Sequence, residues 1–268
     1  MYARSARGGG VLSFKQLGSE AAKYLKGFTL AEVLVTLGII GVVSAMTVPT
    51  LMQNHQRKTY VTQLHKVYNE FQQAAISQIS SRNALNLIES GVRSDADMGN
   101  FLKSQFKVIQ DCTGSPSDCF ADSYKNMNGA AVTAYSEAAA PCFVLASGAA
   151  ICTKYNVSKL LLEPGNSSLP IPSRPTTNPN YIQGLVGDLI IDINAKKGPN
   201  VVGRDIFVAG IYTDGSIKTA LPGLKLVQPE EEIKTSLQKC QSATALARQS
   251  DASYCFAEIL SNNWEMNY

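Results

Sequence analysis

The sequence predicts an α+β protein, in which a long N-terminal helix first spans a membrane and then packs, as an amphipathic helix, on a C-terminal antiparallel β-sheet. Three observations lead to this prediction. An uncharged stretch from Val33 to Asn54 is long enough to cross a bilayer as a helix. Apolar residues then recur at helical spacing to about Ile79, and strand-like segments bounded by turn signals follow in the second half of the chain.

Residues 1–27 form a basic leader. They carry five Lys and Arg residues and a single acidic residue, Glu20, which gives a net charge of +4, whereas the remaining residues have a net charge of −1. The formal charge of +3 on the whole chain therefore belongs to the leader. Because the rest of the chain has no net positive charge that would attract a polyanion, we expect no nucleic-acid partner.

We expect residues 28–52 to cross the membrane once. Lys23 and Lys26 precede the span, which favours a cytoplasmic N-terminus and an exported C-terminal part. Arg57 and Lys58 on the far side weaken this charge argument without reversing it. The apolar stretch is longer than the roughly 7–15-residue core of an ordinary signal peptide, and no Ala-x-Ala-like cleavage site follows it in a suitable context.

One charge, Glu32, enters the membrane with this helix. A charged side chain costs about 2.5–3.5 kcal/mol at the bilayer centre and less near the end of a span, so such a group usually has a partner. Cleavage between Gly27 and Phe28 would create an α-amino group, on the same chain or on a neighbour, that can neutralise the carboxylate. The spacing alone equally allows Glu32 to remain solvated in the head-group region.

The junction resembles the cleavage and methylation signature of type IV pilins and type II secretion pseudopilins. It reads GFTLAEVLVTLGIIGVV from Gly27 onward. The resemblance implies that a prepilin peptidase cuts after Gly27 and methylates the new N-terminal Phe28, and that Glu32 guides the docking of subunits into a filament. It also implies that the long helix bends or melts near Pro49. The leader is longer than in many type IV pilins.

Residues 53–80 continue the helix as an amphipathic segment. Apolar residues recur at three- and four-residue steps with polar residues between them, at Leu51, Tyr60, Val61, Leu64, Val67, Tyr68, Phe71, Ala75 and Ile79. Such a stripe needs something to cover it. We expect a sheet from the exported domain, residues 81–268, to do so, which is also the architecture that the pilin resemblance implies.

Turn signals divide the exported domain into short elements. In chain order we expect a helix at 97–107, a loop at 111–122, a hairpin of CFVLAS and AICTKY around Gly148, an exposed loop at 163–180, strands at 184–192 and 205–212, a turn at Asp214–Gly215, and a return strand from Ile217 to Leu221. At the C-terminus we expect a strand, a turn at Asn262–Asn263 and a second strand, with Trp264 at the edge of the sheet.

Six cysteines all lie downstream of the uncharged stretch. They fall into three locally spaced pairs and none has Cys-x-x-Cys spacing, so disulfides in an oxidising compartment are favoured over a zinc site. Six reduced, buried cysteines in a cytosolic protein are the alternative. The candidate pairs are Cys112 with Cys119, Cys142 with Cys152, and Cys240 with Cys255.

The connection between the two longest strands contains a candidate calcium site. Asp192, Asn194, Asn200 and Asp205 carry oxygens that can ligate calcium, and the segment resembles a loop of pseudopilin-like domains, some of which bind this ion. Lys196, however, stands where an Asp-x-Asn-x-Asp loop would place a ligand. A turn held by hydrogen bonds from Asp and Asn side chains explains the same residues. We expect no other cofactor.

The residue inventory argues against an enzyme. Both histidines, His55 and His65, lie on the N-terminal helix, which leaves the exported domain without a histidine for a nucleophilic pair or a metal site. The resemblance implies three possible roles: a structural subunit of a pilus or pseudopilus, a minor tip subunit that binds a ligand or secreted partner, and a membrane-anchored domain that does not polymerise. Its implied partners are the prepilin peptidase, other pilin or pseudopilin subunits and the lipid of the bacterial inner membrane, with the exported domain in the periplasm or on an extracellular filament.

Overall fold

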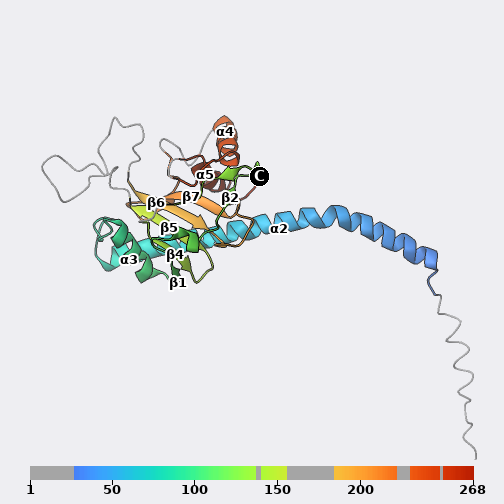
Figure 1. The fold of residues 1–268 in the computed structure, drawn as a ribbon, viewed down its shortest axis with the longest axis horizontal. Coiled ribbons are helices and arrows are strands. Elements are labelled where there is room, and N and C mark those ends of the chain that lie inside the picture. Colours follow the sequence, from blue (N-terminus) through green and yellow to red (C-terminus); the bar gives the residue numbers. More distant parts are fainter. Residues whose placement is uncertain (1–26, 137–139, 156–183, 222–229, 248–249) are drawn as a thin grey trace, which may run out of the picture. The chain divides into compact units, whose positions relative to one another are not determined.

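The computed structural model describes residues 27–136, 140–155, 184–221, 230–247 and 250–268 (Figure 1). The leader up to residue 26 and the predicted loop at 163–180 lie outside the described residues. The chain divides into two compact units at the boundary between Gln53 and Asn54. A long helix followed by an antiparallel six-stranded sheet confirms the predicted α+β, pilin-like arrangement.

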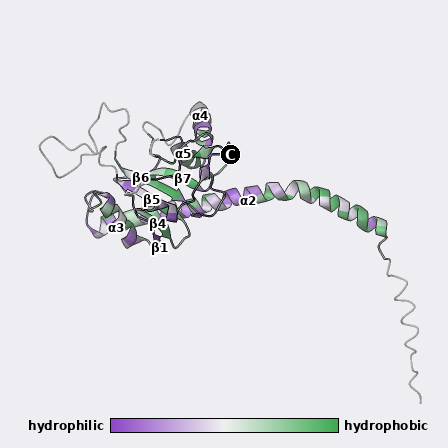
Figure 2. Ribbon diagram, in the orientation of Figure 1, coloured by the Kyte–Doolittle hydropathy of each residue, from purple (hydrophilic) through white to green (hydrophobic). Residues whose placement is uncertain are grey.

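A single helix, α2 (Leu30–Ser81), accounts for the first part of the described chain. Its first residues are strongly apolar, whereas its later residues alternate between apolar and polar types (Figure 2). Pro49 removes one backbone donor from the helix, yet α2 continues through it. Of the two alternatives expected near Pro49, a bend or melting, the helix therefore does not melt, because the hydrogen bonds on either side of one missing donor suffice to maintain it.

The amphipathic half of α2 packs into the core through one stripe. Its buried residues follow three- and four-residue steps, at Val61, Leu64, Val67, Phe71, Ala74, Ala75 and Gln78. Tyr60, Tyr68 and Ile79 are partly buried against the same core, so the predicted stripe is confirmed over most of its length. Leu51, by contrast, is 71% exposed, because it belongs to the apolar part of the helix that precedes the stripe.

The sheet is antiparallel throughout, in the order β1-β4-β5-β6-β7-β8. Its strands are β1 (Val108–Asp111), β4 (Cys142–Leu145), β5 (Ala150–Tyr155), β6 (Leu185–Asp192), β7 (Ile206–Tyr212) and β8 (Ile217–Lys218). A separate pair consists of β2 (Tyr124–Lys125) and β3 (Ala131–Val132). Every residue of β6 is buried, as expected for a central strand whose two faces are both covered.

The predicted hairpin and the two long strands are confirmed. Strands β4 and β5 pair around the Gly148 turn, with Cys142 directly opposite Cys152. Strand β8 is shorter than predicted, because it ends at Lys218 and not at Leu221. The predicted helix at 97–107 is α3 (Asp95–Gln105), which begins two residues earlier because the Ser94 hydroxyl caps it by accepting the Asp97 N–H at 3.1 Å.

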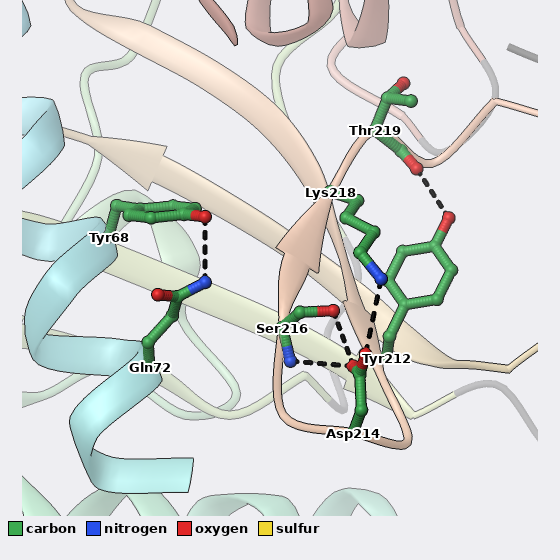
Figure 3. A network of polar contacts seen from close by, with 7 residues as sticks. All are labelled: Tyr68, Gln72, Tyr212, Asp214, Ser216, Lys218 and Thr219. Atoms are coloured by element: carbon green, nitrogen blue, oxygen red, sulfur yellow. Dashed lines mark hydrogen bonds and ion pairs between the residues drawn. The ribbon is translucent and has the colours of Figure 1, made fainter. Parts of the chain in front are cut away.

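The turn between β7 and β8 lies where Asp214 and Gly215 predict it (Figure 3). The Asp214 carboxylate accepts the Ser216 N–H at 2.9 Å and pairs with the Lys218 ammonium at 3.3 Å. Gly215 has φ of +80°, and a Cβ at this position would lie 2.7 Å from the Ala75 side chain. A glycine is therefore required here both by the backbone conformation and by the close approach of the turn to α2.

The predicted C-terminal strands are wrong, although residues 262–264 do form the predicted turn. Residues Ser253–Ser261 form helix α5, which packs on β7 (Figure 1), and no strand follows β8 among the described residues. Cys255, Phe256 and Ile259 are all fully buried, and their spacing places them on one helix face. A further helix, α4 (Glu230–Gln241), was not predicted. Trp264 follows α5, and its ring stacks on His65 of α2 instead of lying at a sheet edge as predicted.

Three disulfides lie in the compact unit that begins at Asn54, as the cysteine pattern predicts. Cys112–Cys119 closes the loop that follows β1, Cys142–Cys152 joins β4 to β5, and Cys240–Cys255 joins α4 to α5. All six cysteines are buried. The third bridge connects the two helices that the strand prediction missed.

Candidate functional site

The first candidate site is the start of α2. Gly27, Phe28 and Thr29 precede the helix in a non-helical conformation, and Phe28 is 85% exposed. The peptide bond between Gly27 and Phe28 is therefore accessible within the described chain. An exposed, non-helical backbone is accessible to a peptidase.

Glu32 has local partners at this end of the helix. Its carboxylate accepts the Thr29 N–H at 2.8 Å and the Thr29 hydroxyl at 2.9 Å. The Glu32 N–H in turn donates to the Thr29 hydroxyl oxygen at 3.2 Å, which completes a capping box. Glu32 thus satisfies donors at the helix start, and a second oxygen of its carboxylate remains able to accept a further donor.

The apolar part of α2 is not covered by the rest of the described chain. Along this part the large side chains are exposed, among them Leu34, Val35, Leu37, Ile39, Ile40 and Val43. By its length and hydropathy α2 is the one described helix that can cross a membrane. Burial of so much apolar surface in lipid or against other helices would be favourable.

The second candidate site is the loop between β6 and β7, which contains the proposed calcium ligands. Asp192 accepts the Tyr124 hydroxyl at 2.6 Å and the Asn194 N–H at 3.2 Å. Asp205 accepts the N–H groups of Asn200 and Val201 at 2.6 and 2.7 Å. Apart from the contact with Tyr124, these hydrogen bonds form the side-chain-to-backbone turn that the residue types also predict.

Burial sets the electrostatics of this loop. It raises the pKa of Asp192 to about 7, with a further increase from the charge of Asp205, and it raises the pKa of Asp205 to about 6 against the hydrogen bonds from Val201 and Asn200. Two carboxylates held in one buried segment destabilise each other when both are ionised. A cation beside them would relieve that repulsion.

Two amide oxygens in the loop have no hydrogen-bond partner among the described residues, namely Asn194 Oδ1 and Asn200 Oδ1. The other amide atom of Asn194 donates to the Gly198 carbonyl at 3.2 Å. Lys196 is exposed and provides no ligand. No cluster of three His, Cys, Asp or Glu side chains occurs in the described part of the chain, so a calcium site here would rely on amide and backbone oxygens as well as on Asp192 and Asp205.

One aromatic contact was not predicted by the sequence. The Trp264 ring stacks on His65 of α2 with centroids 4.1 Å apart, and it meets the edge of Tyr68 at 4.8 Å. His65 and Tyr68 lie three residues apart and therefore share a helix face. Their aromatic character is the signal available in the sequence, but it does not identify which distant residue stacks on them.

Comparison with known proteins gives a match only at the first candidate site, the start of α2. Residues 23–48 match the family model described as the prokaryotic N-terminal methylation motif. Neither the search of curated proteins nor that of solved structures gave a match. The matched segment includes Gly27, Phe28 and Glu32 together with most of the apolar part of α2.

Proposed function

We propose that this chain, which carries the prokaryotic N-terminal methylation motif typical of type IV pilins and type II secretion pseudopilins, is a structural subunit of such a filament. One observation carries the proposal: the motif at 23–48 continues directly into a helix whose apolar part nothing in the described chain covers. A helix of this kind is suited to storage in a membrane and then to packing among identical helices.

Processing follows from the motif, which implies a prepilin peptidase as the first partner. Cleavage after Gly27 would remove the leader, and methylation would modify the new N-terminal Phe28. The exposure of Phe28 and the non-helical backbone around it support access by the peptidase. We propose a leader at 1–27, a membrane span at 28–52, an amphipathic helix at 53–80 and an exported domain at 81–268.

The proposed location is the bacterial inner membrane, with the N-terminus in the cytoplasm and one span. The exported domain would lie in the periplasm, or on an extracellular filament after assembly. Three disulfides within residues 112–255 support export, because disulfides persist in oxidising compartments and not in the cytosol.

Substitution of the cleavage residue tests the proposal. Gly27→Ala should leave the full-length precursor in the membrane, because a side chain at this position obstructs the peptidase. Gly38→Ala is the matched control, since a Cβ there meets nothing within 4 Å and the precursor should be processed normally. Equal processing of both variants, measured by the size of the membrane-bound protein, would contradict the proposed role of Gly27.

A minor tip subunit that binds a ligand or secreted partner is the second candidate. The exported domain supports it, because helices α4 and α5 and their disulfide extend the domain beyond the helix and sheet that packing into a filament requires. Counting subunits in purified filaments distinguishes the two: a structural subunit repeats along the filament, and a tip subunit occurs about once. Absence from filaments altogether would favour a membrane-anchored domain that does not polymerise.

A further inference from the structure

A groove of about 570 Å³ lies in the exported unit, beside the beginning of its α2 segment. One wall belongs to α2 and the other to the segment that follows α5. The lining residues are Asn54, Arg57, Lys58, Val61 and Thr62 on the helix, and residues 263–267 opposite them. Neither the methylation motif nor the predicted sheet accounts for this groove.

The groove has a surplus of positive charge. Arg57 is partly buried and Lys58 is exposed, and within the described chain neither forms an ion pair. Glu265 is the acidic residue of the lining, and its carboxylate accepts an N–H of the Asn267 side chain at 3.3 Å. Two cations against one carboxylate make the groove complementary to an anion.

An aromatic ring and apolar side chains also line the groove. In the segment after α5, Trp264 stacks on His65 at 4.1 Å and Met266 is buried. Val61, on the same helix wall as Arg57 and Lys58, is buried as well. Asn263 and Trp264 have φ of +51° and +63°, a region that bulky residues rarely adopt. Such strain persists only where the surrounding structure imposes it, and it is often found at binding sites. The groove therefore combines a cationic side with a rigid amphipathic ring.

The position of the groove along the chain points to its ligand. Asn54 is the last residue of the uncharged stretch, and Arg57 and Lys58 follow within one helical turn, a rise of about 5–6 Å. Tryptophan and basic side chains are characteristic of the membrane–water interface, where phosphate groups and glycerol backbones lie. Acidic and basic residues nearly balance over residues 28–268, with a net charge of −1, so a second copy has no overall acidic excess that would draw it to the groove.

We propose that this groove binds the phosphate-bearing head group of an anionic phospholipid from the membrane in which α2 is inserted. Arg57 and Lys58 contact the phosphate, and Trp264 lies against the glycerol backbone. The proposal rests on the membrane insertion of α2 in the proposed function, but not on filament assembly. It assigns the exported domain a lipid contact that the apolar span alone does not provide.

Trp264 is the only tryptophan in the chain, so its fluorescence reports on the groove directly. The full chain is reconstituted into nanodiscs of phosphatidylcholine with or without phosphatidylglycerol, each containing lipids with a nitroxide quencher either near the head group or at the acyl end. With phosphatidylglycerol present, quenching of Trp264 should be stronger from the head-group position than from the acyl end, and weaker in phosphatidylcholine alone.

Charge variants separate a specific site from general attraction. Arg57→Gln with Lys58→Gln should reduce the head-group quenching by about half or more in discs that contain phosphatidylglycerol. Lys66→Gln with Lys107→Gln removes the same charge from exposed positions outside the groove and should leave the quenching unchanged. Equal loss in both double variants, or quenching that does not depend on the lipid, would overturn the proposal.

The same nanodiscs test two other possible occupants of the groove. Head-group quenching that is the same with and without phosphatidylglycerol, together with a change in Trp264 fluorescence on adding dissolved glycerol phosphate at millimolar concentration, would identify a free phosphate as the ligand. Quenching that changes with the number of chains per disc would identify a second copy. Either result overturns the lipid proposal. Failure of the chain to enter nanodiscs at all is a different outcome, because it contradicts the membrane insertion on which the proposed function also depends.

Discussion

At the scale of single residues, Glu32 has both a local and an intermolecular explanation. The structure gives its carboxylate two contacts with Thr29, which the sequence did not predict. The proposed filament gives it the α-amino group of a neighbouring Phe28. The two explanations are compatible, because a carboxylate accepts several hydrogen bonds, but they predict different effects of substitution.

Glu32→Ala should be processed normally and fail to assemble, because it removes the charge that pairs with the neighbour's N-terminus. Thr29→Ala is the matched variant: it removes the cap, worth about 1 kcal/mol of helix stability, and keeps the charge. We expect Thr29→Ala to be incorporated into filaments. Incorporation is measured in sheared filament fractions, and equal loss of assembly in both variants would assign Glu32 a capping role alone.

The pH dependence of stability also belongs to the residue scale. Asp192 and Asp205 have folded-state pKa values raised to about 7 and about 6 by burial, above the ordinary value near 3.8. The folded state therefore binds more protons than the unfolded state, so the stability from protonation is complete below about pH 4 and is lost as the pH rises through 6 and 7. In the presence of a chelator, the melting temperature should fall between pH 5 and pH 8.

Asp192→Asn should reduce the fall in melting temperature between pH 5 and pH 8. The amide retains an oxygen that accepts the Tyr124 hydroxyl, but it does not ionise. In the native chain, the free energy of unfolding should fall by roughly 1–3 kcal/mol between pH 5 and pH 8. Thermal unfolding followed by tryptophan fluorescence at both pH values measures it. A melting temperature that rises with pH in the native chain would contradict the assignment.

Calcium binding by the 192–205 loop remains a proposal with its own test. The unpaired oxygens of Asn194 and Asn200 and the two buried carboxylates favour it, and the backbone contacts of Asp205 favour a plain turn. If calcium binds, saturation at about 100 times the dissociation constant should add about 2.7 kcal/mol of stability, and Asp205→Asn should abolish the gain. Calorimetry without a calcium-dependent shift would remove the proposal.

At the scale of elements, α2 was predictable and the C-terminal helices were not. The stripe from Val61 to Ala75 repeats over several turns, and only a helix brings such residues to one face. Helix α5 has nine residues, too few turns for its period to be distinguished from that of a strand. The Cys240–Cys255 bridge and packing on β7 decide its structure. For α4, acidic residues at the start and Lys239 near the end were an available helix signal.

The packing of α2 gives a prediction at this scale. Phe71 is fully buried, whereas Ile76 on the same helix is 63% exposed. Phe71→Ala should destabilise the compact unit that begins at Asn54 by about 3–5 kcal/mol through lost burial and a cavity. Ile76→Ala should change stability by no more than about 0.5 kcal/mol. Denaturant unfolding of the detergent-solubilised chain, followed at Trp264, distinguishes them, and equal effects would contradict the packing of this helix face.

At the scale of the whole molecule, the sequence places different chemistry in successive segments. Positive charge is concentrated in the leader, the uncharged stretch follows, and all six cysteines come after it. These features could be read without the structure, because the charge, the hydropathy and the positions of the cysteines are properties of the sequence itself. The groove at Arg57 and Trp264 could not be predicted from the sequence, because its two walls are separated by about two hundred residues and come together only in the folded chain.

The central claim is that the chain is a processed subunit that begins at the residue after Gly27. Mass spectrometry of the N-terminus of the membrane-bound protein, isolated from cells that contain a prepilin peptidase, tests it most directly. The account predicts a mature chain that starts at N-methylated Phe28. A chain that starts at Met1, or at any residue other than Phe28, would contradict it.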